Sequence, residues 1–174
     1  RVLYHAALEQ NIKTTLESDL LAVYPELSGV SIRKITKLLA IMSGLVPFTP
    51  DLVKLKHLLD IGDERTLKTY FNYLENAGII NLLYRDKDNF RQMAKPEKMY
   101  FNNTNLLYSI GRFSAIDQGN LRETFFLNAI KPLHEVTYSQ HADFLVDAKF
   151  TFEVGGKSKD FSQIKDVENS DQTY

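Results

Sequence analysis

Apolar residues recur every three or four positions through the first half of the chain, which is the spacing of amphipathic helices. Residues 1–26 carry one apolar stripe of this kind, formed by Leu8, Ile12, Leu16 and Leu20. Three more helices are predicted over residues 31–45, 49–59 and 64–77. Side chains that can cap their first turns lie at their starts, and these are Ser31, Thr49 and Asp63.

A β-hairpin is predicted directly after these helices. Gly78 ends the third helix, and the apolar residues 79–84 form the first strand. A polar loop follows, and the chain returns through residues 98–101. Three helices followed by a hairpin is the order of elements in a winged helix. We therefore predict a helical connector over residues 1–27 and a winged helix over residues 28–103.

Short strands follow one helix in the last third of the chain. The helix carries Glu123, and Pro132 ends it. Three strands are predicted near residues 136–138, 143–146 and 150–154. The intervening Asp147-Ala148-Lys149 is predicted to form a hairpin turn. The whole pattern predicts an α+β fold in which residues 104–174 form a small α/β unit.

Composition excludes several classes of protein. The 174 residues include no cysteine, which rules out disulfides, thiolate zinc sites and cysteine catalysis. The four histidines lack the spacing of metal ligands, and no P-loop for a nucleotide phosphate is present. No apolar run has transmembrane length and no signal peptide is visible, so we expect a cytoplasmic protein without a membrane partner. The chain starts at Arg1 and ends on a polar tail, so we expect a truncated piece of a longer protein.

The net charge of −1 is unevenly spread along the chain. Residues 27–103 carry twelve basic and eight acidic side chains, whereas residues 104–174 carry seven and ten. A basic segment favours contact with duplex DNA. The side chains placed to reach phosphates and base edges are Arg65, Lys68, Thr69, Asn72, Arg85 and Lys87. The opposing interpretation is an ordinary solvated helix face, because Asp63, Glu64 and Glu75 lie on the same helix.

Acidic side chains in the last third indicate a metal site. Glu123 lies on the predicted helix, Asp143 at the start of a strand, and Glu153 on the next strand. This is the order in which PD-(D/E)XK nucleases present their metal-binding carboxylates. Carboxylates held close together repel one another unless a cation lies between them. We therefore predict that Asp143 and Glu153 hold Mg²⁺ and that Glu123 completes a candidate catalytic site.

The lysine of that nuclease motif is displaced in this chain. Side chains two apart on a strand share a face, so the motif places its lysine two residues after the second acid. Gly155 occupies that position, and Lys157 lies about 13 Å beyond Glu153 at roughly 3.3 Å per residue. A bulge at Gly155-Gly156 would return Lys157 to the acids as a fourth candidate catalytic residue. The alternative is that Glu153 is a polar residue on an edge strand and Lys157 is solvated.

The segments that carry a family resemblance run through almost the whole chain. They are residues 67–75 (LKTYFNYLE), 95–100 (KPEKMY), 103–106 (NTNL), 122–126 (RETFF) and 143–147 (DFLVD). Together they resemble the C-terminal domain that follows the ATPase core in a family of prokaryotic AAA-type ATPases. The resemblance implies an N-terminal P-loop module that binds ATP and Mg²⁺, a winged helix, and a restriction-endonuclease-like fold that is often degenerate. The final motif of the family resembles Glu-Val-Lys, where this chain has Glu153-Val154-Gly155.

The expected function is accessory. By this resemblance, the chain recognises nucleic acid or a protein partner and couples that recognition to nucleotide turnover in its own N-terminal ATPase module. The chain itself lacks the nucleotide site. Two alternatives stay open from the residues alone, namely a Mg²⁺-dependent nuclease of the PD-(D/E)XK type and a non-catalytic assembly module.

Overall fold

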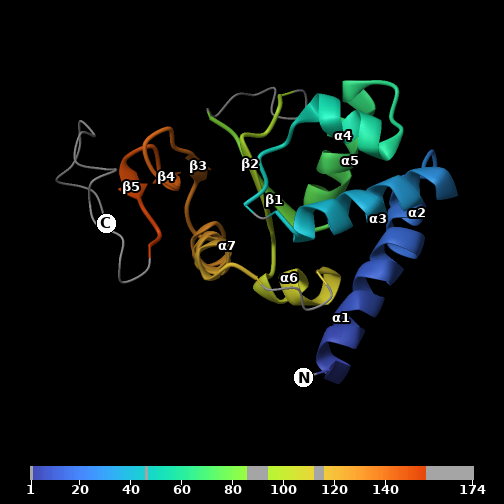
Figure 1. Ribbon diagram of the computed structural model, residues 1–174, viewed down its shortest axis with the longest axis horizontal. Coiled ribbons are helices and arrows are strands. Elements are labelled where there is room, and N and C mark those ends of the chain that lie inside the picture. Colours follow the sequence, from blue (N-terminus) through green and yellow to red (C-terminus); the bar gives the residue numbers. More distant parts are fainter. Residues whose placement is uncertain (1, 46, 86–93, 112–115, 156–174) are drawn as a thin grey trace.

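The described residues form the mixed α+β fold that the sequence pattern predicts. The computed structural model describes residues 2–45, 47–85, 94–111 and 116–155. Several helices gather around a two-stranded hairpin, and a three-stranded sheet lies on the side of the molecule opposite to the N-terminal helix (Figure 1). Lys87 and Lys157 fall outside the described residues.

The N-terminal segment is one long helical rod. It consists of α1 (Val2–Thr14), a π-helical turn (Thr15–Asp19) and α2 (Leu20–Val23). Leu16 and Leu20 from the predicted apolar stripe are buried, and the π-helical turn contacts α3. The helix ends at Val23 rather than near residue 26, and Leu27 just beyond it is buried. The second half of the predicted connector therefore contributes three leucines to the hydrophobic core, while most of its other side chains are exposed or partly exposed.

The three predicted helices are present, but two of the predicted N-caps are wrong. The helices are α3 (Gly29–Ser43), α4 (Leu52–Leu59) and α5 (Glu64–Asn76). Ser28 caps α3 by accepting from the N–H of Ser31 at 3.1 Å. Asp51 caps α4 and Asp63 caps α5, each accepting from the N–H three residues on, at 2.9 and 2.8 Å. Thr49 does not cap because the chain before it is drawn into an extended pairing with the hairpin.

The hairpin forms between β1 (Ile80–Leu83) and β2 (Lys98–Phe101), which pair antiparallel. Gly78 has a φ of +67°, a left-handed conformation that glycine adopts without steric cost, and this lets the chain turn out of α5 into β1. Phe48 and Met99 exchange backbone hydrogen bonds of 2.9 and 2.8 Å. The segment between α3 and α4 therefore pairs with β2 opposite β1.

The last third contains two helices and a small sheet. Its elements are α6 (Thr104–Ile110), α7 (Gln118–Ile130), β3 (Val136–Tyr138), β4 (Phe144–Val146) and β5 (Phe150–Phe152). The strands are antiparallel in the order β3-β4-β5. Asp147 and Ala148 have φ values of 52° and 55°, which confirms the predicted hairpin turn. β5 ends at Phe152, so Glu153 lies just past the strand.

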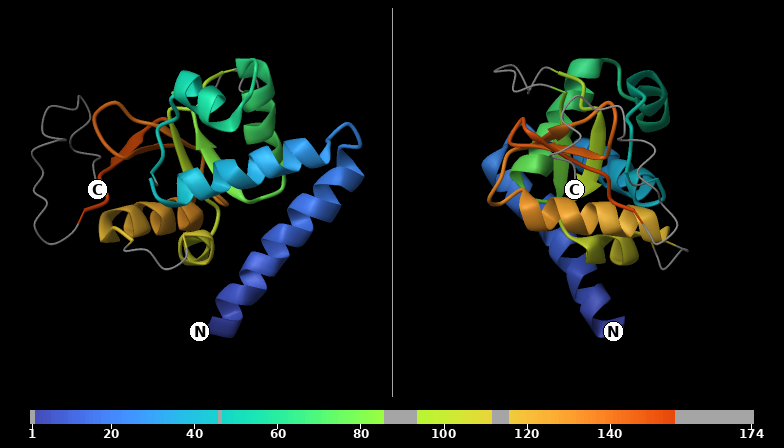
Figure 2. Two further views of the ribbon diagram at one scale, coloured as in Figure 1. Left: turned by 45° about the vertical axis from the view of Figure 1, so that its right-hand side comes forward. Right: turned by 90° about the vertical axis from the view of Figure 1, so that its left-hand side faces the viewer.

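Aromatic rings join α7 to the small sheet. The ring of Phe126 lies 5.3 Å from that of Phe144 and 5.0 Å from that of Phe152, and Figure 2 shows α7 running along the sheet. The backbone N–H of Tyr138 donates to the carbonyl of Tyr84 at 2.8 Å, which links β3 to the end of β1. No helix in the described ranges has the length and apolar composition needed to cross a bilayer.

A polar network fixes α7 against α5 and β1. Lys131 Nζ donates to Glu75 Oε1 at 3.3 Å and to Asn81 Oδ1 at 2.8 Å. The side chain of Asn81 is buried, and its Nδ2 donates to Asn102 and Asn128, each at 2.9 Å. Because the buried amide is fully bonded, the network adds orientation without leaving an unsatisfied polar group.

Candidate functional site

Two of the three predicted acids meet at a lysine that the sequence did not point to. Glu123 comes from α7, Asp143 lies just before β4, and Lys98 opens β2. Lys98 Nζ lies 3.8 Å from Glu123 Oε2 and 3.5 Å from Asp143 Oδ1. The two acids are only 9% and 8% exposed. One ammonium group therefore offsets the repulsion between two nearly buried carboxylates.

Hydrogen bonds complete this arrangement, which we call the acid–lysine cluster (Lys98, Tyr100, Glu123 and Asp143). Tyr100 Oη donates to Glu123 Oε2 at 2.9 Å, and the N–H of Val154 donates to Asp143 Oδ2 at 2.9 Å. Burial, and then the negative charge of Glu123, raise the pKa of Tyr100 far above its ordinary value. Tyr100 therefore stays protonated and serves as a donor, not as a base.

Glu153 lies beside the cluster at the protein surface. Together with Asp143 it lines an open, polar hollow of about 380 Å³, whose other walls are Gln140, His141 and Ala142. Asp143 thus belongs both to the cluster and to the hollow. Within the part of the chain that the structure describes, no group of three or more histidine, aspartate or glutamate side chains is arranged to hold a metal ion.

Lys98 and Tyr100 are the residues that sequence reasoning missed. They lie two apart on β2, so both side chains project from the same face of that strand. The alternation in Lys98-Met99-Tyr100 was the available signal, because it places two polar side chains on one face and a methionine on the other. Nothing local indicated that this face would meet α7 and the segment before β4.

The predicted DNA-contacting side chains of α5 share one face of that helix. Arg65 is exposed, and Lys68, Thr69 and Asn72 are partly buried. The residues that α5 buries lie on the opposite face, and they are Leu67, Tyr70, Phe71 and Leu74. Thr69 Oγ1 donates to the carbonyl of Arg65 at 2.9 Å, which keeps its hydroxyl on the helix.

Arg85, predicted to contact DNA from the hairpin, is engaged within the protein. Its guanidinium lies 3.1 Å from Glu97 Oε1 and 5.8 Å from the centre of the Tyr138 ring. A phosphate would have to compete with both contacts. Lys87, the other predicted hairpin residue, lies outside the described residues.

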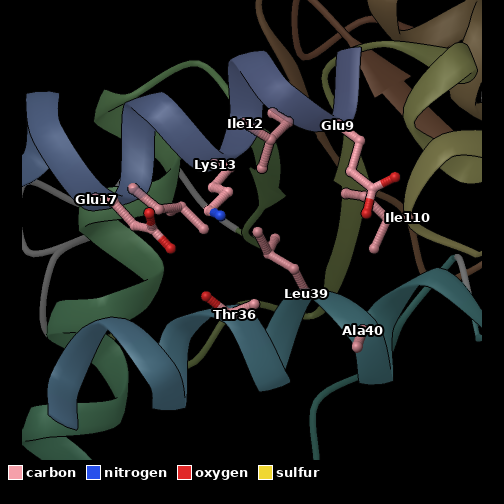
Figure 3. Close-up of a pocket in the computed structure, with 9 residues that line it drawn as sticks. Glu9, Ile12, Lys13, Glu17, Thr36, Leu39, Ala40 and Ile110 are labelled. Carbon is pink, nitrogen blue, oxygen red and sulfur yellow. The ribbon is translucent and has the colours of Figure 1, made fainter. Parts of the chain in front are cut away.

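A second hollow, of about 330 Å³, lies between the N-terminal rod and α3 (Figure 3). Its apolar surface includes Leu16 and Leu39, and Glu9, Lys13 and Glu17 line it from the rod. Opposite charges four residues apart on a helix stabilise one another, so Lys13 is balanced by its two neighbours. None of the predicted site residues lies in this hollow.

The comparison with known families covers about two thirds of the chain. The profile of a domain of unknown function, DUF8612, matches residues 3–117, which extend from α1 through α6. The matched residues include Lys98 and Tyr100 but stop before the acids of the cluster. No curated protein and no solved structure matches the chain. Since the match spans more than half of its length, the chain belongs to the DUF8612 family.

Proposed function

We propose that this chain is the C-terminal accessory region of an AAA-type ATPase and that it recognises duplex DNA through α5. In this proposal residues 28–103 act as a winged helix. The acid–lysine cluster, in a degenerate restriction-endonuclease-like unit, has a structural role. The ATPase part is supported by the family resemblance in the sequence. It implies a P-loop in the protein sequence upstream of Arg1, and a full-length sequence without one would contradict that part.

The order and pairing of the elements support the winged-helix part of the proposal. The chain runs through α3, a paired segment at Phe48, α4, α5 and the β1-β2 hairpin. In a winged helix the third helix is the one that enters the major groove. The corresponding helix here is α5. Residues 86–93, which follow the first strand of the hairpin, lie outside the described residues.

The observation that carries the DNA proposal is the division of α5 into two faces. Its buried face is aliphatic and aromatic, and its opposite face presents Arg65, Lys68, Thr69 and Asn72. A guanidinium and an ammonium can neutralise phosphates, and an amide can reach base edges. The carboxylate of Asp63 accepts hydrogen bonds from the N–H and the hydroxyl of Thr66. It lies at the N-terminus of α5, where the helix dipole favours a negative charge, and therefore acts as the helix cap.

Removing two cations from this face should weaken DNA binding in a salt-dependent way. We expect Arg65→Ala/Lys68→Ala to lower the slope of log K against log[KCl] by about 2, because each phosphate contact releases roughly 0.9 counterion. The measurement is fluorescence anisotropy of a labelled duplex across a KCl series. The matched control is Lys13→Ala/Arg122→Ala, which removes the same charges from other elements and should keep the slope. Equal slopes for both double variants would contradict contact through α5.

The acid–lysine cluster fits a structural role better than a metal site. A magnesium site needs several oxygen ligands around an open position. Here Lys98 already supplies a positive charge to both carboxylates, and Tyr100 and the Val154 N–H occupy further oxygen lone pairs. These contacts of both carboxylates support the structural role.

A Mg²⁺-dependent nuclease is the second candidate function, and it is favoured by the meeting of Glu123 and Asp143 at one lysine. The two candidates differ in their response to metal. If the cluster is structural, adding Mg²⁺ or Mn²⁺ should leave the thermal unfolding midpoint unchanged, because only a ligand that binds the folded state raises it. Differential scanning fluorimetry checks this. A rise in the midpoint that Asp143→Asn abolishes would favour the nuclease.

A further inference from the structure

Helix α7 buries one face and carries an exposed aromatic side chain on another. Its inner face buries Leu127 and Thr124 in the core. Its outer face carries Leu121, Phe125 and Ala129, and the Phe125 side chain is 66% exposed. Exposed apolar surface next to an apolar hollow often marks an interaction site. Among the described residues, the outer face of α7 is therefore a candidate interaction surface.

This face borders a hollow of about 510 Å³ between α6, α7 and the end of β5. Its lining is almost entirely aliphatic and aromatic: Thr104, Tyr108, Leu121, Arg122, Phe125, Phe126, Ala129, Ile130 and Val154. Arg122 is the only charged side chain among these residues. Aromatic residues and arginine are the types that are enriched at the centres of protein interfaces.

We propose that this hollow is a docking site for an apolar segment of a protein partner that carries a carboxylate opposite Arg122. An apolar side chain of the partner enters between Tyr108, Phe125 and Phe126. The carboxylate pairs with the exposed guanidinium of Arg122, which can accept it with two parallel hydrogen bonds. The surrounding apolar contacts exclude water from this ion pair. The charge of Arg122 therefore has a large influence on which partner segment binds.

Two other occupants of the hollow are a second copy of this chain and duplex DNA, and both fit its lining less well than an acidic, apolar protein segment. In a two-fold contact centred on the hollow, Arg122 would face Arg122 of a second copy, and like charges repel. Duplex DNA would offer phosphates to Arg122 but nothing to Phe125 or Leu121. The docking site is also separate from the outer face of α5, so its failure would leave the DNA proposal untouched.

The probe is a fluorescein-labelled nine-residue peptide in which two leucines flank one glutamate, and its partner peptide carries lysine instead. We expect the wild-type protein to bind the glutamate peptide about tenfold more tightly, the ratio that about 1.4 kcal/mol produces. Arg122→Glu should reverse the order of the two peptides. Phe125→Ser should weaken both peptides by a similar factor, because it removes the apolar wall and leaves the charge.

Several outcomes would overturn the proposal. They are equal binding of the two peptides, absence of binding at millimolar peptide, or an Arg122→Glu variant that keeps the original preference. Displacement of the glutamate peptide by neutral phosphatidylcholine vesicles would assign the face to lipid. A wild-type dimer that Phe125→Ser dissociates would assign it to a second copy. Both substituted residues are exposed, so circular dichroism should show wild-type folding; if Phe125→Ser is unfolded, the charge reversal at Arg122 decides alone.

Discussion

Replacing Lys98 with methionine is expected to lower the free energy of unfolding by about 3 kcal/mol, because it leaves two nearly buried carboxylates without their counter-ion. Methionine is similar in length to the aliphatic part of lysine and lacks the ammonium group, so the substitution removes the charge together with its hydrogen bond to Asp143. Lys98 lies 3.8 Å from Glu123 and 3.5 Å from Asp143, and its own side chain is 19% exposed. Urea unfolding followed by circular dichroism measures the change.

Two controls separate the loss of the ion pairs from a general effect of the substitution. Lys13→Met changes an exposed lysine on α1 and should alter stability by no more than about 0.5 kcal/mol. The triple variant Lys98→Met/Glu123→Gln/Asp143→Asn should recover much of the loss, because neutral groups replace the whole charged set. If Lys98→Met is as stable as the wild type, the cluster has no structural role. A destabilised triple variant would assign the loss to packing instead.

Truncating Phe144 to alanine is expected to cost about 3–5 kcal/mol of stability, the range for a large aromatic side chain in a core. Phe144 is 0% exposed, and its ring lies 5.7 Å from that of Tyr100 and 5.3 Å from that of Phe126. It therefore connects β4 to both β2 and α7. Removing it should also loosen the strand that follows Asp143, so hydrogen exchange of the β4 amides should accelerate.

The matched control is Phe125→Ala, because the same atoms are removed from the neighbouring helix at a side chain that is 66% exposed. This variant should unfold within about 0.5 kcal/mol of the wild type, since little buried surface is lost. Similar losses for the two variants would mean that the burial of Phe144 is not what holds the sheet to α7.

Local sequence signals predicted the helices, strands and turns correctly where the tertiary packing favours the same conformation as the neighbouring residues. The period of α5, its cap at Asp63, the glycine that ends it and the strand that returns as β2 all match the structure. The turn at Asp147 is also confirmed. These features depend on neighbours within a few residues, so the chain itself contains the information.

Predictions failed where distant segments decide the local conformation. Thr49 and Pro50 suit a helix start, but the backbone pairing of Phe48 with Met99 keeps that segment extended and moves the cap to Asp51. The surroundings of Arg85 also depend on residues farther along the chain, since its guanidinium pairs with Glu97 and lies over the Tyr138 ring, while its contact with phosphate stays a prediction.

The sequence by itself determined the α+β class, the order of helices and strands, and the three acids of the last third. Only the tertiary structure decided what those acids meet. Lys98 reaches Glu123 and Asp143 because β2, α7 and the segment before β4 converge, although the residues are 25 and 45 positions apart. Periodicity fixes which face of an element is buried, but it does not fix which faces meet. The positive charge that neutralises Glu123 and Asp143 therefore comes from β2, a strand that lies outside the acidic segments of the last third.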